Sequence, residues 1–482
     1  MRGNAAAPDS RESITADTSR WIDRELAGEE IFHRRRSLTT VGAVCLVAAS
    51  TVLYQAVSRR VPVPAATALR RAAEVKNDPF LQVLLLLEAG PEIHPGRAYR
   101  ELARSLVSTP VPVAVLHAGS PVTSVRFARD GGTVAAGLAN GRARVWRSPS
   151  DFTEVTSGGR GILSVSLSPN GERLLTVASS GESAVAELWE MPGGRIVTKL
   201  PGVSGVAALD GQTPITLVPI PGALRLVGHS NAGTNKGISC TVSAAQEGAP
   251  RAVRFSDSGD TAVAVFSTWS LTTRPLCRAA MTTQGGSRLR EAVLSSSGDF
   301  VATVTERHLT VWSVSPAEQV HETDTDLVLK ESVTTHLAVA PDGGAVAAGH
   351  ADGHAVLADW QDGGAFADHV WVSTMQGHRA AVADVAFSAD GRFIATAGGD
   401  GFVLLWRNPE RSVTPEIEDP PIEWDELWRI LRTRTTVCLS AADRARLLEE
   451  SASVAVRGSQ DCEQRWGLRT IGALNPKERM RN

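Results

Sequence analysis

Cysteine is scarce in this sequence, and its spacing does not suggest a metal site. The five cysteines form no CxxC pair and no Cys/His combination with zinc-ligand spacing. The Walker A phosphate loop, the HExxH motif and the glycine-rich dinucleotide fingerprint are also absent. We therefore expect no bound metal and no cofactor.

The sequence also lacks a large excess of charge of either sign. The formal net charge is −3 over 482 residues, which gives no electrostatic argument for binding nucleic acid. Apolar residues make up 43% of the chain, enough for a substantial core. Lysine is rare beside arginine, a bias typical of GC-rich bacterial genomes, so we expect a bacterial source; the lysines are Lys76, Lys199, Lys236, Lys330 and Lys477.

An uncharged run follows the polar N-terminal tail, residues 1–36. Residues 37–58 contain no charged side chain and lie between two arginine clusters. As a helix this run would span about 33 Å, enough for a hydrocarbon core of about 30 Å. A buried core helix and a cleaved signal peptide are the alternatives, but no small-x-small cleavage site precedes Arg59. We expect a single-pass membrane helix.

The arginines around this run bear on its orientation. Three precede it and two follow it, which favours an N-terminus in the cytoplasm and the rest of the chain outside.

Residues 61–109 are predicted to form a small helical connector. Helical patterns cover 68–75, 79–90 and 95–106. Asn77 or Asp78 before Pro79 is a helix start signal, and Gly90 is a stop signal.

The clearest unit in the chain is 377–407, which reads as three short strands joined by two Asp-Gly turns. A sheet this small cannot bury its own face, so the unit predicts copies beside it. Its Gly377-His378 start, Asp400 and Trp406 resemble the WD-repeat unit. The resemblance implies a β-propeller and a buried hydrogen-bonded network of His378, Thr396, Asp400 and Trp406.

A glycine in the first turn marks each predicted copy between residues 111 and 407. The mean spacing is about 43 residues, close to the expected period of ~40–45. The marks predict an all-β, seven-bladed propeller; they are Gly131, Gly171, Gly222, Gly259, Gly298, Gly343 and Gly391. Blade three, residues 203–245, has the weakest pattern.

The network appears complete only in the last blade. Blade one has Asn140 in the place of Asp400, and blade six has Ala358 in the place of Trp406. We therefore expect apolar packing to hold most of the ring. The last blade lacks a fourth strand of its own, and residues 111–116 are predicted to supply it and so close the ring.

The C-terminal part follows an acidic, proline-rich linker, 408–421. Residues 422–470 are predicted to form a helical tail, with Ile422 or Trp424, Leu427, Trp428 and Leu431 on one face. We expect that face to pack on the propeller rim or within the tail. Cys438 and Cys462 flank its helices, and a disulfide and two buried thiols both remain open.

The connector and the tail both resemble segments of bacterial WD-repeat proteins, notably those fused to STAND-type NTPases. The connector does so through a DPxL…LLLxEA pattern at residues 78–89. That resemblance implies a non-enzymatic interaction platform with a protein partner.

Three places could still carry chemistry. Gly228-His229-Ser230 resembles part of a hydrolase nucleophile elbow, but its context is a blade and not a strand-turn-helix. His350 and His354 flank Asp352 and could be metal ligands, although an exposed turn is the simpler reading. Asp384 is expected to line a propeller face.

We therefore predict a membrane-anchored scaffold, and one role open to it is that of a sensor component in bacterial signalling or defence. The alternative is a propeller hydrolase using His229 and Ser230 or a carboxylate pocket in the central channel. Convergence of acidic and histidine side chains on that channel would favour the alternative.

Overall fold

The structure is a computed structural model. It describes residues 63–181, 183–203, 207–210, 213–221, 223–229, 235–242, 252–257, 259–266, 269–273, 279–284, 289–325, 334–360, 370–408 and 423–471. The polar tail, the proposed membrane segment 37–58 and the linker 408–421 apart from Asn408 lie outside these residues, as does Ile422. Within them, no helix is both long and apolar enough to cross a bilayer.

The chain divides into two compact units. One contains Met1–Thr109 with Glu416–Arg465, and the other contains Pro110–Pro415 with Trp466–Asn482.

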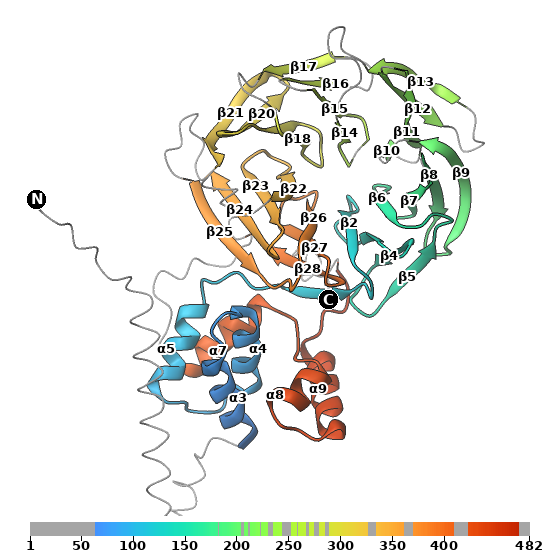
Figure 1. The fold of residues 1–482 in the computed structure, drawn as a ribbon. Coiled ribbons are helices and arrows are strands. Elements are labelled where there is room, and N and C mark those ends of the chain that lie inside the picture. Colours follow the sequence, from blue (N-terminus) through green and yellow to red (C-terminus); the bar gives the residue numbers. More distant parts are fainter. Residues whose placement is uncertain are drawn as a thin grey trace, which may run out of the picture. The chain divides into compact units, whose positions relative to one another are not determined.

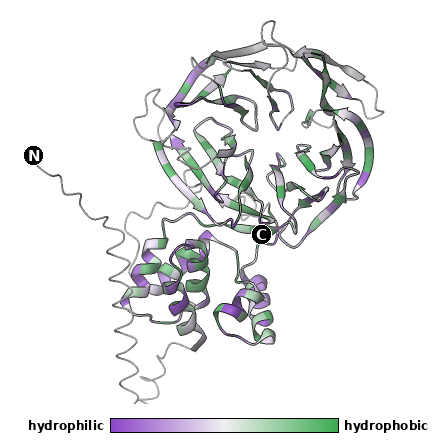
Figure 2. Cartoon of the chain, in the orientation of Figure 1, coloured by the Kyte–Doolittle hydropathy of each residue, from purple (hydrophilic) through white to green (hydrophobic). Residues whose placement is uncertain are grey.

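The second unit is a ring of seven four-stranded antiparallel sheets (Figure 1). Hydrophobic residues recur along the strands of every sheet for which Figure 2 gives colour. Blades one to three are β2 (Val122–Phe127), β3 (Val134–Leu138), β4 (Arg142–Trp146), β5 (Phe152–Thr156); β6 (Ile162–Leu167), β7 (Arg173–Ser180), β8 (Ser183–Glu190), β9 (Arg195–Val203); and β10 (Ala207–Asp210), β11 (Thr213–Ile220), β12 (Ala223–His229), β13 (Asn235–Val242).

Blades four to seven follow the same order. They are β14 (Ala252–Phe255), β15 (Ala262–Val265), β16 (Trp269–Thr273), β17 (Ala279–Gln284); β18 (Glu291–Leu294), β19 (Phe300–Val304), β20 (His308–Val314), β21 (Ala317–Asp324); β22 (Thr334–Val339), β23 (Ala345–His350), β24 (His354–Trp360), β25 (Val370–Gln376); and β26 (Val382–Phe387), β27 (Phe393–Gly398), β28 (Phe402–Arg407) with β1 (Ala114–His117). The seven-bladed prediction is confirmed.

The ring closes as predicted, through a strand from the front of the propeller. β1 pairs antiparallel with β28, from Ala114 opposite Leu405 to His117 opposite Phe402. A continuous apolar cluster joins the first and last blades, and Leu116, Val125 and Leu405 in it are fully buried. Leu468 and Ile471 pack on the same cluster, so the predicted tail boundary at 470 cuts through a segment that belongs to the propeller.

Blade three is complete, but its predicted turn was misplaced. Pro221 and Gly222 lie between β11 and β12, which is the second turn of the blade and not the first. The connection between the first two strands instead falls between Asp210 and Thr213, which pair with each other. The two turns carry similar glycine signals, so the sequence pattern alone ranked the wrong one higher.

The first unit is helical and is built from the segments that precede and follow the propeller in the sequence. The connector supplies α3 (Val63–Glu74), α4 (Pro79–Glu88) and α5 (Arg97–Leu106); the C-terminal part supplies α7 (Trp424–Arg434), α8 (Ala441–Leu447) and α9 (Ala452–Trp466). Asp78 caps α4 by accepting the Leu81 N–H at 2.8 Å, as its position before Pro79 predicts.

The tryptophan face of α7 packs on the connector, so both predicted locations for it were wrong. The Trp424 Nε1–H donates to Gly90 O at 2.7 Å, and the Trp428 Nε1–H donates to Leu87 O at 3.0 Å. Carbonyls at the end of a helix have no partner within the helix, so the two indoles satisfy the end of α4. Sequence periodicity identified the buried face but not the helix that covers it.

The helical unit also contains Cys438 and Cys462, for which the sequence allowed either a disulfide or two buried thiols. Cys438 and Cys462 are joined by a disulfide that closes a sequence separation of 24 residues. α9 has little else to hold it, because only Ala455 and Ser459 of its residues are buried. Gly458 lies against the Arg444 guanidinium, which is ion-paired with Glu88 and Glu450.

Replacing both Cys438 and Cys462 with serine is expected to free α9. Loss of a disulfide closing a loop of this size costs about 3 kcal/mol, more than the thin packing of α9 replaces. Trypsin should then cut after the exposed Arg457 at least about tenfold faster, measured by mass spectrometry during limited digestion. Cleavage after Arg142, in the ring, is the internal control; equal acceleration at both sites would contradict the prediction.

Candidate functional site in the propeller channel

The residues predicted as a network in the last blade lie together. His378 Nδ1 lies 3.1 Å from both carboxylate oxygens of Asp400, and its Nε2 lies 2.8 Å from Thr396 Oγ1. The Trp406 Nε1–H donates to the same Thr396 hydroxyl at 3.0 Å. All four groups are satisfied if the Thr396 hydroxyl donates to His378 Nε2 and the Nδ1–H donates to Asp400.

Asp400 also holds the chain around this network. It accepts the N–H of Arg379 at 2.8 Å and that of Phe402 at 3.2 Å. Burial alone would raise the pKa of Asp400, but the hydrogen bonds from His378 and Arg379 outweigh it and hold that pKa below its ordinary value. The Asp400 carboxylate is therefore occupied by hydrogen bonds that stabilise the blade, and it is not available as a base near neutral pH.

Half of this network recurs in blades two and five, which keep the tryptophan. Trp189 donates to Thr176 Oγ1 at 2.9 Å in blade two, and Trp312 donates to Thr303 Oγ1 at 2.8 Å in blade five. Each threonine lies five residues after the turn glycine of its blade, as Thr396 does. Blade one has Ala136 at that position, and Trp146 Nε1 is buried there without a partner.

Side chains from five blades converge on the channel inside the ring. Asp384, His336 and Glu291 each lie seven residues before the turn glycine of their blade, and Arg126 and Arg254 each lie five before. Positions two apart on a strand face the same side, and these are the innermost strands of their sheets (Figure 1). Aligning the units on the turn glycines would have found this set from the sequence; single motifs did not.

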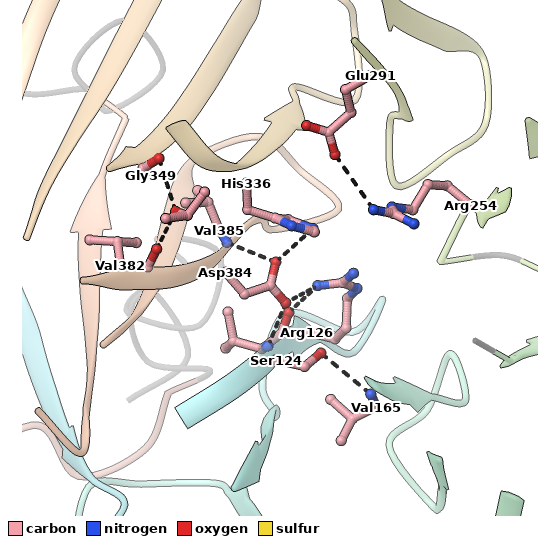
Figure 3. Close-up of polar contacts among 12 residues, drawn as sticks. Ser124, Arg126, Val165, Arg254, Glu291, His336, Gly349, Val382, Asp384 and Val385 are labelled. Carbon is pink, nitrogen blue, oxygen red and sulfur yellow. Dashed lines mark hydrogen bonds and ion pairs between the residues drawn. The ribbon is translucent and has the colours of Figure 1, made fainter. Parts of the chain in front are cut away.

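Asp384 is the centre of this cluster, as Figure 3 shows. Arg126 Nη1 donates to its Oδ2 at 2.7 Å, and His336 Nε2 lies 3.1 Å from its Oδ1. The Val125 N–H donates to the same Oδ2 at 2.9 Å, and the Val385 N–H donates to Oδ1 at 2.9 Å. One carboxylate on β26 therefore binds groups on the inner strands of the first and sixth blades.

A repeated contact between neighbouring blades underlies this arrangement. Ser124 occupies in blade one the position that Asp384 occupies in blade seven, and its Oγ accepts the Val165 N–H of blade two at 3.4 Å. Asp384 makes the same contact with Val125 across the joint where the ring closes, and adds a charge that binds Arg126.

Arg126 extends the cluster across the ring to blade four. Its Nε lies 3.5 Å from Asp257 Oδ1, in the turn after β14. Arg254, also on β14, lies 3.6 Å from Glu291 of blade five. The acidic, basic and histidine side chains that meet here are thus paired with one another.

The two aspartates differ in pKa. Burial alone would raise the pKa of Asp384, but Arg126, His336 and the Val125 N–H hold it below its ordinary value. Burial raises the pKa of Asp257 to about 6; Arg126 opposes this shift and the charge of Asp384 adds to it. The negative charge of Asp257 is therefore less well compensated by its neighbours than that of Asp384.

The space between these side chains is small. A cavity of about 50 Å³ is lined by residues of blades one, four, five, six and seven, including Arg126, Arg254, Asp257, Ser296 and His336. Such a volume accommodates water molecules, whereas ligand sites usually measure about 300–1,000 Å³. The paired side chains connect inner strands of five blades around this cavity.

Replacing Asp257 with asparagine is expected to stabilise the protein at neutral pH. Because folding raises the pKa of this carboxyl, its contribution to the free energy of unfolding falls as pH increases from about 4 to about 6. The variant should gain roughly 2–4 °C in melting temperature at pH 7.5 and nothing at pH 4. Differential scanning fluorimetry at both pH values tests this; a loss at pH 7.5 would show that the pairing with Arg126 outweighs the burial.

The remaining residues singled out from the sequence do not assemble into a second centre. His229 Nε2 bonds to Thr216 Oγ1 at 2.7 Å inside blade three, and Ser230 lies outside the described residues. His350 is buried at the end of β23, which corrects the expected exposed turn, while His354 is half-buried and its Nδ1 lies 3.4 Å from Asp352 Oδ2. Nowhere in the described ranges do three or more potential metal ligands gather.

Two stretches of the chain match a known protein family. Residues 110–147 and 370–407 match the WD40 family, described as "WD domain, G-beta repeat". The first stretch spans β1 to β4 and the second spans β25 to β28, so the family signal covers both sides of the closing joint. The comparison with curated proteins found no match.

Two of the solved structures that this chain matches are the following. The Myceliophteria thermophila Cps50 (Swd1) β-propeller domain is 15% identical, with a TM-score of 0.49, over 62% of this chain and 99% of that chain. A chain of the Mitotic Checkpoint Complex is 15% identical, with a TM-score of 0.47, over 62% of this chain and 91% of that one. With seven four-stranded blades and two stretches that match the WD40 repeat, the larger unit of this protein is a seven-bladed WD40-repeat β-propeller.

Proposed function

We propose that this protein is a non-enzymatic scaffold that binds a protein partner through its propeller and is held at a membrane by residues 37–58. The observation that carries the proposal is the mutual pairing of the channel side chains around a cavity of about 50 Å³. A ring whose channel side chains are paired with one another offers its faces and rim for binding, as WD40 propellers typically do. The net charge of −3 gives nucleic acid no advantage as the partner.

A hydrolase in the channel is the second candidate, and one observation favours it. Acidic and histidine side chains do converge there, and Asp257 has a pKa of about 6, which is suitable for a general base. Its side chain is 32% exposed, so water reaches it. Against this, the cavity lacks room for a substrate, and the remaining carboxylates are already bound to cations.

A fluorophosphonate probe separates the two candidates for a serine hydrolase. We expect no labelling of the purified full chain, and the same result for a Ser230→Ala variant. Labelling of the wild type that is lost in Ser230→Ala would refute the scaffold proposal.

Binding itself is tested by isolating the full chain from a detergent extract and identifying what accompanies it. The proposal requires a defined protein that also binds the purified chain in a titration. Failure of every co-purifying protein to bind the purified chain would count against it.

We further propose that the propeller and the helical unit lie outside the cytoplasm, with the N-terminus inside. The disulfide between Cys438 and Cys462 supports this, as does a disulfide at Cys240, because such bonds persist in oxidising compartments. In a bacterium this chain would then be a sensor or scaffold component of a signalling or defence system whose enzyme is a separate chain.

Cysteine labelling on intact cells tests the orientation. A membrane-impermeant maleimide should label Glu318→Cys, at an exposed position on β21, without lysis. Ser10→Cys, before the proposed membrane helix, should react only after lysis. The reverse pattern would place the propeller in the cytoplasm.

A further inference from the structure

The outer strand of blade six differs from the other outer strands of the ring. Among the strands that the structure describes, β25 pairs only with β24, so its other edge carries backbone donors and acceptors that none of these strands covers. Its sequence, Val-Trp-Val-Ser-Thr-Met-Gln, contains no charged residue and no proline. Trp371 is 62% exposed and Val372 is 37% exposed. An edge of this kind is the form that proteins usually avoid unless it has a partner.

The other outer strands carry features that discourage edge pairing. β9 contains Arg195, Lys199 and Pro201, and β21 contains Glu318, Glu322 and Asp324. β5 contains Glu154, which is ion-paired with Arg142 and Arg144; β1 has only four residues, and β13 contains a lysine. β17 shares the lack of charge but contains no aromatic residue. β25 combines an uncharged edge with two apolar side chains that are exposed, Trp371 and Val372.

We propose that β25 is a self-association edge, which pairs antiparallel with β25 of a second copy of this chain. Two copies centred on Ser373 would place Trp371 opposite Met375 and Val372 opposite Thr374, so that no like charges face each other. The pairing has two-fold symmetry and therefore closes as a dimer and does not propagate. An acidic or basic partner segment would find no opposite charge on this strand, which favours a second copy over a charged peptide.

The expected dimer is weak. A seven-residue strand pair buries less than the standard interface of about 1,600 Å², so affinity in the micromolar range or weaker is expected. Confinement to a membrane would raise the effective concentration and make such an affinity sufficient. The proposal does not depend on which protein the propeller faces bind.

Cross-linking of the full chain in membranes tests the pairing. In Ser373→Cys, the two new thiols face each other across the two-fold axis, at the Cβ separation of about 4.5–5.5 Å found for opposed residues. Mild oxidation or a short bismaleimide should give a dimer-sized product on non-reducing electrophoresis. The matched control is Thr198→Cys, at a half-buried position in the middle of β9.

We expect a dimer-sized product at least tenfold stronger from Ser373→Cys than from Thr198→Cys. Adding Trp371→Lys should abolish it, whereas adding Ile196→Lys on β9 should leave it; unchanged melting temperatures confirm that both lysine variants fold. Equal yields from the two cysteine variants, insensitivity to Trp371→Lys, or cross-linking of Ser373→Cys only to a different protein would each overturn the proposal.

Discussion

Replacing Asp384 with alanine is expected to lower the melting temperature of the propeller by roughly 10 °C. Its side chain is only 3% exposed and binds Arg126, His336 and the Val125 N–H, which come from two other blades. Removing one partner of a buried ion pair costs about 3–5 kcal/mol, because the other charge is left uncompensated. For domains of this size each kcal/mol corresponds to about 2–4 °C.

Asp384→Asn is the matched control for this prediction. An amide still accepts the Val125 N–H but no longer neutralises Arg126, so an intermediate loss is expected. The pH dependence has a defined sign: because the pKa of Asp384 is lowered on folding, its stabilisation is present above about pH 4 and disappears as pH falls. The gap between wild type and Asp384→Ala should therefore narrow below pH 4. A constant gap would show that packing, and not charge, is lost.

Asp400→Ala is expected to destabilise the ring far more than Asn140→Ala. Asp400 binds His378 and accepts two backbone N–H groups, whereas Asn140, its counterpart in blade one, accepts only the Arg142 N–H at 3.1 Å. We expect a difference of about 2 kcal/mol, from one charge-assisted bond and one further backbone bond. Chemical denaturation of both variants measures it; equal midpoints would contradict the account of ring closure.

The tryptophans provide a second comparison in the same blades. Trp406→Ala is expected to cost more than Trp312→Ala, although both indoles donate to a threonine hydroxyl. Trp406 is almost completely buried between blades six and seven, in the blade that β1 completes, while Trp312 is only partly buried. Similar losses at both sites would show that the closing blade has no special weight.

Much of the fold could be predicted because each blade repeats the same local signals. Alternating apolar residues and a glycine in the first turn identify the strands in six blades and predict the closing role of 111–116. The prediction of the first turn of blade three was wrong because Gly211 and Gly222 give similar turn signals in the sequence. Local patterns define elements well, whereas the choice between two equivalent turns depends on pairing across the sheet.

The channel cluster and the helical unit were harder to predict because both depend on contacts distant in sequence. Asp384 and Arg126 are separated by 258 residues, and Trp428 contacts Leu87 across 341. Periodicity shows that such side chains are buried but not what they meet. The membrane segment and its orientation remain predictions from hydropathy and arginine placement.

The most direct test of the account is partner capture from membranes with a graded series of full-length variants. Wild type, Asn140→Ala, Asp400→Ala and Asp384→Ala differ in the expected stability of the ring but share the membrane segment and the helical unit. If the propeller is the binding element, the amount of the captured partner should fall in that order at a temperature near the melting point of Asp384→Ala. Equal capture by all four variants would show that binding resides outside the propeller.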